Sequence, residues 1–239
     1  MNWQPDAHTV WAFCESLKEH KLAEVLFDRL NQALAEMGIE LKSGQIIDAT
    51  FDPVPIQRNG RDNNALIKAE AVPIRWGLDT EQHNKLAHKD TKLIASHACT
   101  DASVHDSQVF EAVLRNQDAG GGQVWANSAY RSEEQEQSLK DSEHTSQINE
   151  RAYRGKPLSV SQEISNKAKS RVRARVEHVF GHMENSMSGI FIRSIGIART
   201  KVGVTLINLD YNLSRVEVLI RNKTFDFERI SAPKIATAA

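Results

Sequence analysis

The amino-acid sequence predicts an α/β (α+β) domain in which helices flank one sheet. Four short runs of apolar and β-branched residues, at 45–50, 93–99, 123–126 and 146–148, are typical of buried strands. Segments with helical spacing of apolar residues lie between and after these runs, and this alternation builds a sheet covered by helices. With 239 residues, 40% of them hydrophobic and 26% charged, the chain is long enough to bury one good core.

Residues 1–43 are predicted to form an N-terminal helical segment with two helices. Asp6 is a suitable N-cap for the first helix, and Gly38 is a suitable stop for the second. The faces expected to be buried carry apolar residues at helical spacing, namely Val10, Phe13 and Leu17, then Leu22, Leu26, Leu30, Ala33, Leu34 and Met37. We expect this pair to be part of a larger helical unit.

Residues 44–221 are predicted to form the main domain, and residues 222–239 a frayed tail. Asp48 lies near the end of the first strand run and is expected at the rim of the sheet. Residues 57–92 show little pattern, so we expect a long loop there.

Three helices are expected around the remaining strands. Their starts are placed at Asp101, Ser103 or Asp106, at Ser132, and near Val202, and the last of these helices reaches Leu219. Residues 190–197 have a β-like composition between two glycines and are interpreted as extended chain.

One further helix, from Asn166 to Met183, combines a basic flank with a single carboxylate, Glu177. Apolar residues recur along it at helical spacing, so one continuous amphipathic helix is expected, with Val172, Val176, Val179 and Met183 on its buried side. Residues 151–175 contain eight Lys or Arg residues and one acid, a balance of +7 in a chain of net charge −1. Such a block favours a polyanion site, whereas the plainer interpretation is a solvated face with Arg–Glu pairs.

Composition narrows the class of protein. The two cysteines, Cys14 and Cys99, form no spacing motif, which suits a reducing cytoplasm. No apolar run is long enough to span a membrane, and the first residues lack the apolar segment of a signal peptide. We therefore expect a cytoplasmic protein without a membrane partner. His97, His105 and His178 lack the spacing of a zinc site and are interpreted as structural or solvent-facing.

Carboxylates near strand ends, together with Glu177, predict a divalent-metal site for phosphoryl transfer. Cutting and joining nucleic acid with two Mg²⁺ ions needs hard oxygen ligands, usually three acids. Asp48 and Glu177 suit two of these places, and Asn127 stands where the third is expected, after the strand at 123–126. The alternatives are a strand-end Asp that turns the chain, a Glu in a surface pair with Arg173, and an Asn in a turn.

Six blocks of the sequence resemble a known family. They are GQIIDAT (44–50), TDASVHDSQ (100–108), VWANSAYRS (124–132), KSRVRARVEHVFG (169–181), RSIG (193–196) and NLDYNL (208–213). Together they resemble the DDE transposases of bacterial insertion sequences, of the insertion-sequence-five type in the insertion-sequence-four-like superfamily. The resemblance covers nearly all of residues 3–221, and the block leading to Glu177 is highly specific.

The resemblance implies a ribonuclease H-like mixed sheet and an enzyme that cuts and rejoins DNA at the terminal inverted repeats of its element. It implies Mg²⁺ (or Mn²⁺) as cofactor and double-stranded DNA as partner, with a homodimer as a further expectation. Asp48 matches the first catalytic Asp and Glu177 the catalytic Glu, so both are expected to bind metal. The residues expected to bind DNA phosphates are Lys167, Lys169, Arg171, Arg173 and Arg175.

Three departures from the family pattern predict weak activity or none. Asn127 stands where the family has its second catalytic Asp, and an amide cannot bridge two cations as a carboxylate does. Between the strand that holds Asp48 and the strand at 93–99, the family has another strand with a Gly-Tyr-Lys-x-His-like run, and none is recognisable here. The chain also begins inside the family's N-terminal helical region. These departures predict a shortened, degenerate transposase. The alternatives are a non-catalytic DNA-binding remnant and a chain that does not fold stably.

Overall fold

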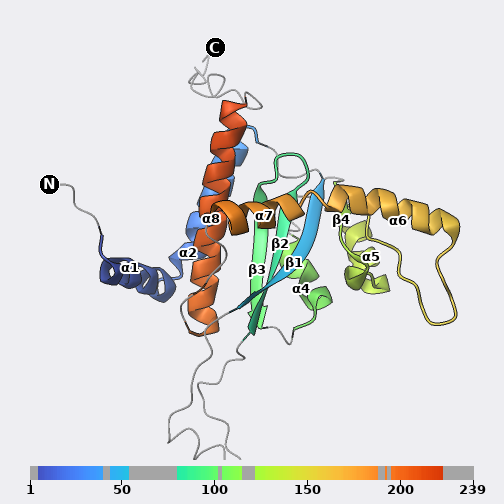
Figure 1. Cartoon of the computed structure of the whole chain (residues 1–239), viewed down its shortest axis with the longest axis horizontal. Coiled ribbons are helices and arrows are strands. Elements are labelled where there is room, and N and C mark those ends of the chain that lie inside the picture. The colour runs from blue at the N-terminus through green and yellow to red at the C-terminus, as the bar shows by residue number, and fades with distance from the viewer. Residues whose placement is uncertain are drawn as a thin grey trace, which may run out of the picture.

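The structure, a computed structural model, describes residues 5–39, 44–53, 80–101, 104–114, 122–187, 192 and 195–222. Within these residues, one five-stranded sheet in the order β3-β2-β1-β4-β5 is flanked by helices (Figure 1). The strands are β1 (Gln45–Pro53), β2 (Thr80–His88), β3 (Ile94–Asp101), β4 (Gln123–Trp125) and β5 (Thr145–Ser146). Strands β1, β2 and β3 pair antiparallel, whereas β4 runs parallel to both β1 and β5. The predicted α+β class with a mixed, ribonuclease H-like sheet is confirmed.

Strand β2 corrects the expectation of a loop over residues 57–92 and of a missing strand. It pairs with β1 from Gln45↔His88 to Pro53↔Thr80, and with β3 on its other side. Its sequence, TEQHNKLAH, has almost no apolar alternation, which is why the pattern does not reveal it. A central strand can be held by backbone hydrogen bonds to both neighbours. Residues 57–79 of the expected loop lie outside the described residues.

The two faces of the sheet build two cores, because neighbouring strand residues point to opposite sides. Ile47 belongs to the core that also holds Phe110 of α4 (Asp106–Val113) and Leu139 of α5 (Glu133–Asp141). Ile46 belongs to the other core, which holds Met183 of α7 (Glu177–Ser186) and Tyr211 of α8 (Ile197–Arg221). Asp48 is two residues beyond Ile46, so its side chain points to the face of the sheet that carries the core with α7 and α8.

The predicted N-terminal helices are present as α1 (Ala7–Glu19) and α2 (Leu22–Glu36), but their buried faces match the expected ones only in part, at Leu17 and Leu34. Asp6 caps α1 through Thr9, and Gly38 follows α2 with a φ of 78°, as predicted. Val10 and Phe13 of α1 are exposed, as are Leu22 and Leu26 of α2. The residues that bury are Leu17 in α1 and Ala23, Phe27, Asn31 and Leu34 in α2.

Helix α8 decides which faces of α1 and α2 are buried. It packs against both of them and against β3. Its Arg199 forms a two-point ion pair with Glu15 of α1, at 2.5 and 3.0 Å. Its Asn212 side chain bonds both backbone groups of Ile94 on the edge strand, at 2.8 Å each. The helix predicted from Val202 to Leu219 is thus confirmed, and Ile197, expected in extended chain, is its first residue.

The expected continuous helix from Asn166 to Met183 is two helices, α6 (Val160–Arg173) and α7, separated by a turn at 174–176. In that turn the backbone N–H groups bond the carbonyl three residues back, for example Val176 N to Arg173 O at 3.0 Å. The tightened turn lets α7 lie across the sheet while α6 extends away from it (Figure 1). The predicted apolar side is buried in α7, whereas α6 has no buried residue.

Candidate functional site

Asp48 and Asn127 follow the paired residues of two neighbouring parallel strands. Strands β1 and β4 are parallel neighbours, and their last paired residues are Ile46 and Trp125. Asp48 and Asn127 each follow two residues later. Asn127 lies beyond the end of β4, whereas Asp48 is the fourth of the nine residues of β1, so the expectation of Asp48 near a strand end at the rim of the sheet is wrong. The side-chain alternation of strands directs both toward the face covered by α7.

Arg173 joins the two predicted acids. Its Nη1 lies 2.9 Å from Oδ2 of Asp48 and 4.0 Å from Oε1 of Glu177. Glu177 is the first residue of α7, four residues after Arg173, so the turn at 174–176 leaves it within reach of the same guanidinium as Asp48. The fold therefore brings Asp48 and Glu177, which are far apart in the sequence, to one guanidinium group.

The two carboxylates differ in exposure. The Asp48 side chain is 11% exposed and also accepts the backbone N–H of Ala49 at 3.1 Å. The Glu177 side chain is 62% exposed. Asp48 is therefore held in a defined place, whereas Glu177 can turn toward solvent or toward a bound ligand.

Asn127 uses its carbonyl oxygen within its own turn. Its Oδ1 accepts the backbone N–H of Ala129 at 2.7 Å and caps the short 3₁₀ helix η1 (Ser128–Tyr130). Tyr130 at the end of η1 is completely buried and contacts the ring of Phe110. The geometry therefore matches the plainer interpretation, in which Asn127 is a turn residue. The Oδ1 atom that a metal would need is already engaged in this turn.

These residues, as arranged, do not fit a divalent cation. The candidate ligands are the carboxylates of Asp48 and Glu177 and the amide of Asn127, whose oxygen is engaged in its own turn. The positive charge beside Asp48 already comes from the Arg173 guanidinium. In the part of the chain that the structure describes, no group of three His, Cys, Asp or Glu residues could hold a metal ion. Metal binding by Asp48 and Glu177 stays a prediction.

Lys85 is a site neighbour that the sequence analysis missed. It faces Asp48 across the β1–β2 ladder and is 1% exposed. Its Nζ lies 3.2 Å from the Met183 sulfur and 5.1 Å from the centre of the Phe180 ring. Burial lowers the pKa of this amine to about 7. No sequence signal marks Lys85, because β2 itself has no recognisable strand pattern.

Three of the five predicted phosphate-binding residues have protein partners. Arg173 pairs with Asp48, Lys169 donates to the Ile148 carbonyl at 2.9 Å, and Arg175 pairs with Asp90 at 2.8 Å. These contacts tie α6 and the following turn to the domain. They also explain why only part of the basic block at 167–175 is available to bind a partner.

Lys167 and Arg171 are the two members of the set that are exposed and have no partner among the described residues. Both are exposed on α6, and neither has a hydrogen bond or ion pair with any other described residue. Their spacing of four residues places them on one side of the helix. Because α6 extends away from the sheet (Figure 1), this side is accessible to a large partner.

Polar contacts that the sequence analysis did not foresee hold α6 in place. Ser159 and Gln162 form a capping box at its start. The Asn166 side chain bonds both backbone groups of Glu150, at 2.8 and 3.0 Å. Asn149 donates to the Ser170 hydroxyl at 3.0 Å. Only the capping box has a sequence signature, S-x-x-Q, that could have been found.

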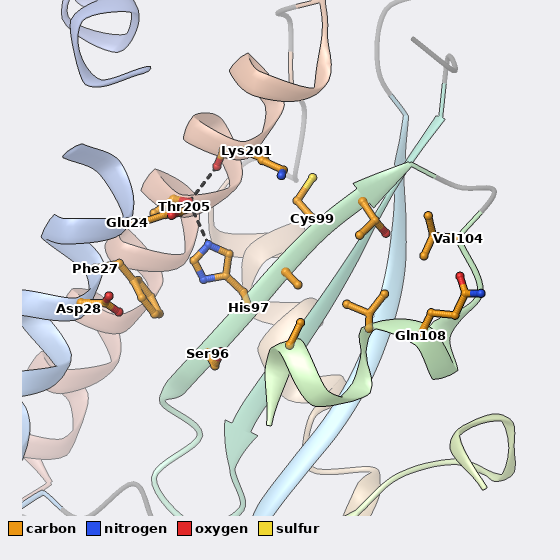
Figure 2. A pocket seen from close by; sticks show the side chains of 14 residues that line it. Glu24, Phe27, Asp28, Ser96, His97, Cys99, Val104, Gln108, Lys201 and Thr205 are labelled. Atoms are coloured by element: carbon orange, nitrogen blue, oxygen red, sulfur yellow. Dashed lines mark hydrogen bonds between the residues drawn. The ribbon is translucent and has the colours of Figure 1, made fainter. Parts of the chain in front are cut away.

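A separate cavity of about 450 Å³ runs along β3 between α2, α4 and α8. Figure 2 shows His97 in it, with Nε2 2.9 Å from the Thr205 hydroxyl, which in turn donates to the Lys201 carbonyl at 2.8 Å. The Phe27 ring meets His97 edge-on, with 4.7 Å between ring centres. These contacts give His97 a packing role. The cavity contains none of the three predicted catalytic residues.

No helix within the described residues has the length and apolar character needed to cross a membrane. A search of the solved structures finds no match to the chain. Residues 40–213 match the family model of the transposase DDE domain. This span is well over half of the 239 residues and includes Asp48, Asn127 and Glu177. The chain therefore belongs to the transposase DDE domain family.

Proposed function

We propose that the protein is an insertion-sequence-five-type transposase that binds the terminal inverted repeats of its element but cuts DNA weakly or not at all. The family accounts for the general role, DNA transposition with DNA as the partner. The observation that carries the impairment is Asn127, a neutral amide engaged in its own turn at the third place of the site. The same proposal keeps a cytoplasmic location and a homodimer as predictions.

The exposed basic side of α6 supports DNA binding. Lys167 and Arg171 project from a helix that stands away from the domain and buries no residue of its own. Lys and Arg side chains that neutralise phosphates release counterions, which is the main source of sequence-independent affinity for DNA. Contacts of this kind position a duplex without reading its sequence.

The neutral residue at position 127 supports weak cleavage. DDE transposase domains generally use divalent metal ions, and a third carboxylate normally shares the charge of such ions. Here Asp48 and Glu177 face one guanidinium, and Asn127 adds no negative charge. Since β2 completes the sheet, a missing strand no longer contributes to the expected impairment.

Asn127→Asp tests this proposal. An Asp caps a helix about as well as an Asn, so η1 should persist while the site gains its third acid. We expect Mg²⁺- or Mn²⁺-dependent cleavage of duplex DNA that carries the element ends to appear in the variant and to be weak or absent in the wild type. The measurement is the rate of strand nicking on DNA taken from both flanks of the coding sequence.

Asn185→Asp is the matched control, because it makes the same charge change on an exposed position of α7. It should leave cleavage at the wild-type level. Robust cleavage by the wild type would refute the proposed impairment. A folded, DNA-binding Asn127→Asp protein without any gain in cleavage would show that the acid is not what the site lacks.

A second candidate function is a non-catalytic DNA-binding remnant that competes for element ends. The Asp48–Arg173 pair favours it, because a guanidinium beside the buried acid opposes metal entry. A gel-shift assay with and without divalent metal distinguishes the two functions. Binding that ignores metal and weakens steeply with salt favours the remnant.

A further inference from the structure

We propose that the start of α6 is an apolar wedge that enters the base stack of a DNA duplex, with Ile164 as the inserted side chain and Val160 beside it. The inference rests on the proposed DNA-binding function. It adds a contact that distorts the duplex to the contacts that hold its phosphates.

Val160 and Ile164 are the most exposed large apolar side chains in the described part of the chain, at 73% and 66%. They belong to a helix that buries no residue, so they add nothing to either core. The start of α6, where both lie, is also the part of the helix farthest from the sheet (Figure 1). Apolar side chains that gather at one exposed end indicate a contact surface.

Val160, Ile164, Lys167 and Arg171 form one stripe along α6, and all four are exposed. At about 100° per residue, their directions fall within about 60° of one another. A rise of about 1.5 Å per residue puts Lys167 about 4.5 Å and Arg171 about 10.5 Å beyond Ile164 along the helix axis. The cations proposed to bind phosphates therefore lie within about two helical turns of the apolar end.

Charge indicates which partner the stripe fits. Besides the two cations on it, three more are exposed in the chain that precedes α6, namely Arg151, Arg154 and Lys156. The one acid of the helix, Glu163, points about 70° away from the middle of the stripe. An apolar end that continues into a row of cations suits a polyanion with an apolar interior. A DNA duplex has this chemistry, because its phosphates flank stacked bases.

A second copy of the chain fits the stripe less well. Helix α5 is the acidic helix of the domain, with three acids in its first turn, and it could match the cations. None of its large apolar side chains is exposed, however, so it offers nothing to cover Ile164. A duplex matches the cations and the apolar end together.

Insertion of Ile164 between two base pairs replaces its contact with water by contact with base faces, which is favourable for an apolar side chain. Apolar wedges of this kind, Ile among them, partly unstack one step and kink the duplex by about 20–90°. Unstacking is unfavourable, and it is easiest at pyrimidine–purine steps. Phosphate contacts from Lys167 and Arg171 hold the duplex against the wedge. The wedge therefore predicts a preference for DNA that is already unstacked.

The experiment titrates the full chain against two duplexes of one sequence, one fully paired and one with a single central mismatch. Fluorescence anisotropy gives the Kd of each. For the wild type we expect the mismatched duplex to bind at least about tenfold more tightly, because every 1.4 kcal/mol of unstacking that is saved corresponds to tenfold in affinity. Energy transfer between dyes at the two ends of the paired duplex should rise on binding, because a kink brings the ends closer.

Ile164→Gln removes the wedge and keeps a good helix former at an exposed position. It should bind both duplexes about equally and leave the energy transfer low, while its slope of log K against log[salt] stays that of the wild type. Ile164→Leu keeps the apolar volume and should keep the preference. Val25→Gln, at a 56% exposed position of α2, is the matched control and should behave as the wild type. Circular dichroism checks that each variant is folded, and the wild-type titrations need no variant at all.

The outcomes separate the wedge from the proposed function. Equal binding of both duplexes by the wild type, without a change in energy transfer, overturns the wedge while DNA binding stands. A preference that persists in Ile164→Gln overturns it as well. If Ile164→Gln changes only the oligomeric state, measured by light scattering, the stripe is a protein contact and the wedge is wrong. If the wild type binds neither duplex, the proposed function and the wedge both fail.

Discussion

At the scale of single residues, the site combines an engaged amide with a buried amine. Asn127 serves as a cap whatever its chemical role, and an Asp would serve the same turn. An amide at this position therefore carries no charge and still supports the same local structure as an acid would. Lys85 lies on the strand opposite Asp48, in contact with Met183 of the helix that begins at Glu177.

Lys85 makes stability depend on pH. Its pKa is about 7 in the folded chain, below the usual value of 10.5. Between these values the unfolded chain binds more protons, so the free energy of unfolding rises with pH from about 7 to about 10. The penalty is largest below pH 7, and each unit of pKa difference corresponds to about 1.4 kcal/mol.

Lys85→Met should therefore raise the free energy of unfolding at pH 7 by a few kcal/mol and flatten its rise toward pH 10, because Met fills the same space without a charge. Urea unfolding at several pH values measures both effects. Lys140→Met, on an exposed position of α5, should keep the wild-type slope. A wild-type slope retained in Lys85→Met would contradict the assigned cause.

At the scale of elements, α6 is held by caps and polar contacts instead of a core. It has no buried residue, and Val160 and Ile164 are 73% and 66% exposed. An isolated helix of this length is marginal in water. Its stability therefore depends on the capping box and on the links from Asn166 and Ser170 to residues 149–150.

Ser159→Ala should loosen α6 without unfolding the domain. Loss of an N-cap typically costs about 0.5–2 kcal/mol, and here this cost falls on a helix outside the core. We expect faster amide hydrogen exchange throughout α6, with the protection of β1 and β2 unchanged. Ser165→Ala, a solvent-facing position in the same helix, should leave exchange as it is. Equal exchange in both variants would mean that the cap does not stabilise α6.

At the scale of the whole molecule, positive charge is concentrated in residues 151–175 of a nearly neutral chain. The net charge is −1, whereas residues 151–175 carry a balance of +7. Three of the eight cations, Arg173, Lys169 and Arg175, are paired with protein groups. The other five are exposed, three of them before α6 (Arg151, Arg154 and Lys156) and two on α6 (Lys167 and Arg171). This division predicts that only the outward-facing cations set the salt dependence of DNA binding.

The double variant Lys167→Gln, Arg171→Gln should reduce the slope of log K against log[salt] by about 2, because each phosphate contact contributes about 0.9. Fluorescence anisotropy with duplex DNA at several salt concentrations measures this slope. Lys140→Gln on α5 provides the control and should leave the slope unchanged. An unchanged slope in the double variant would exclude α6 as the phosphate-binding face.

Much of the local structure could be predicted from the sequence. The strands β1, β3, β4 and β5, the caps Asp6 and Ser132, and the buried side of α7 are found where patterns place them. These features depend on residues close together in the chain. The domain boundaries, the metal site and the homodimer stay predictions.

By itself, the sequence determined the family and the class of fold, because apolar periodicity and motif spacing are local properties of the chain. Only the tertiary structure decided that the polar segment Thr80–His88 is a central strand, since its stability comes from hydrogen bonds to two distant neighbours. It also decided that Arg173, predicted to bind phosphate, instead pairs with Asp48. At the turn that follows Arg173, Val176 is buried in a core with Ile46 and Met183, and such contacts between residues far apart in the sequence are not revealed by helical periodicity.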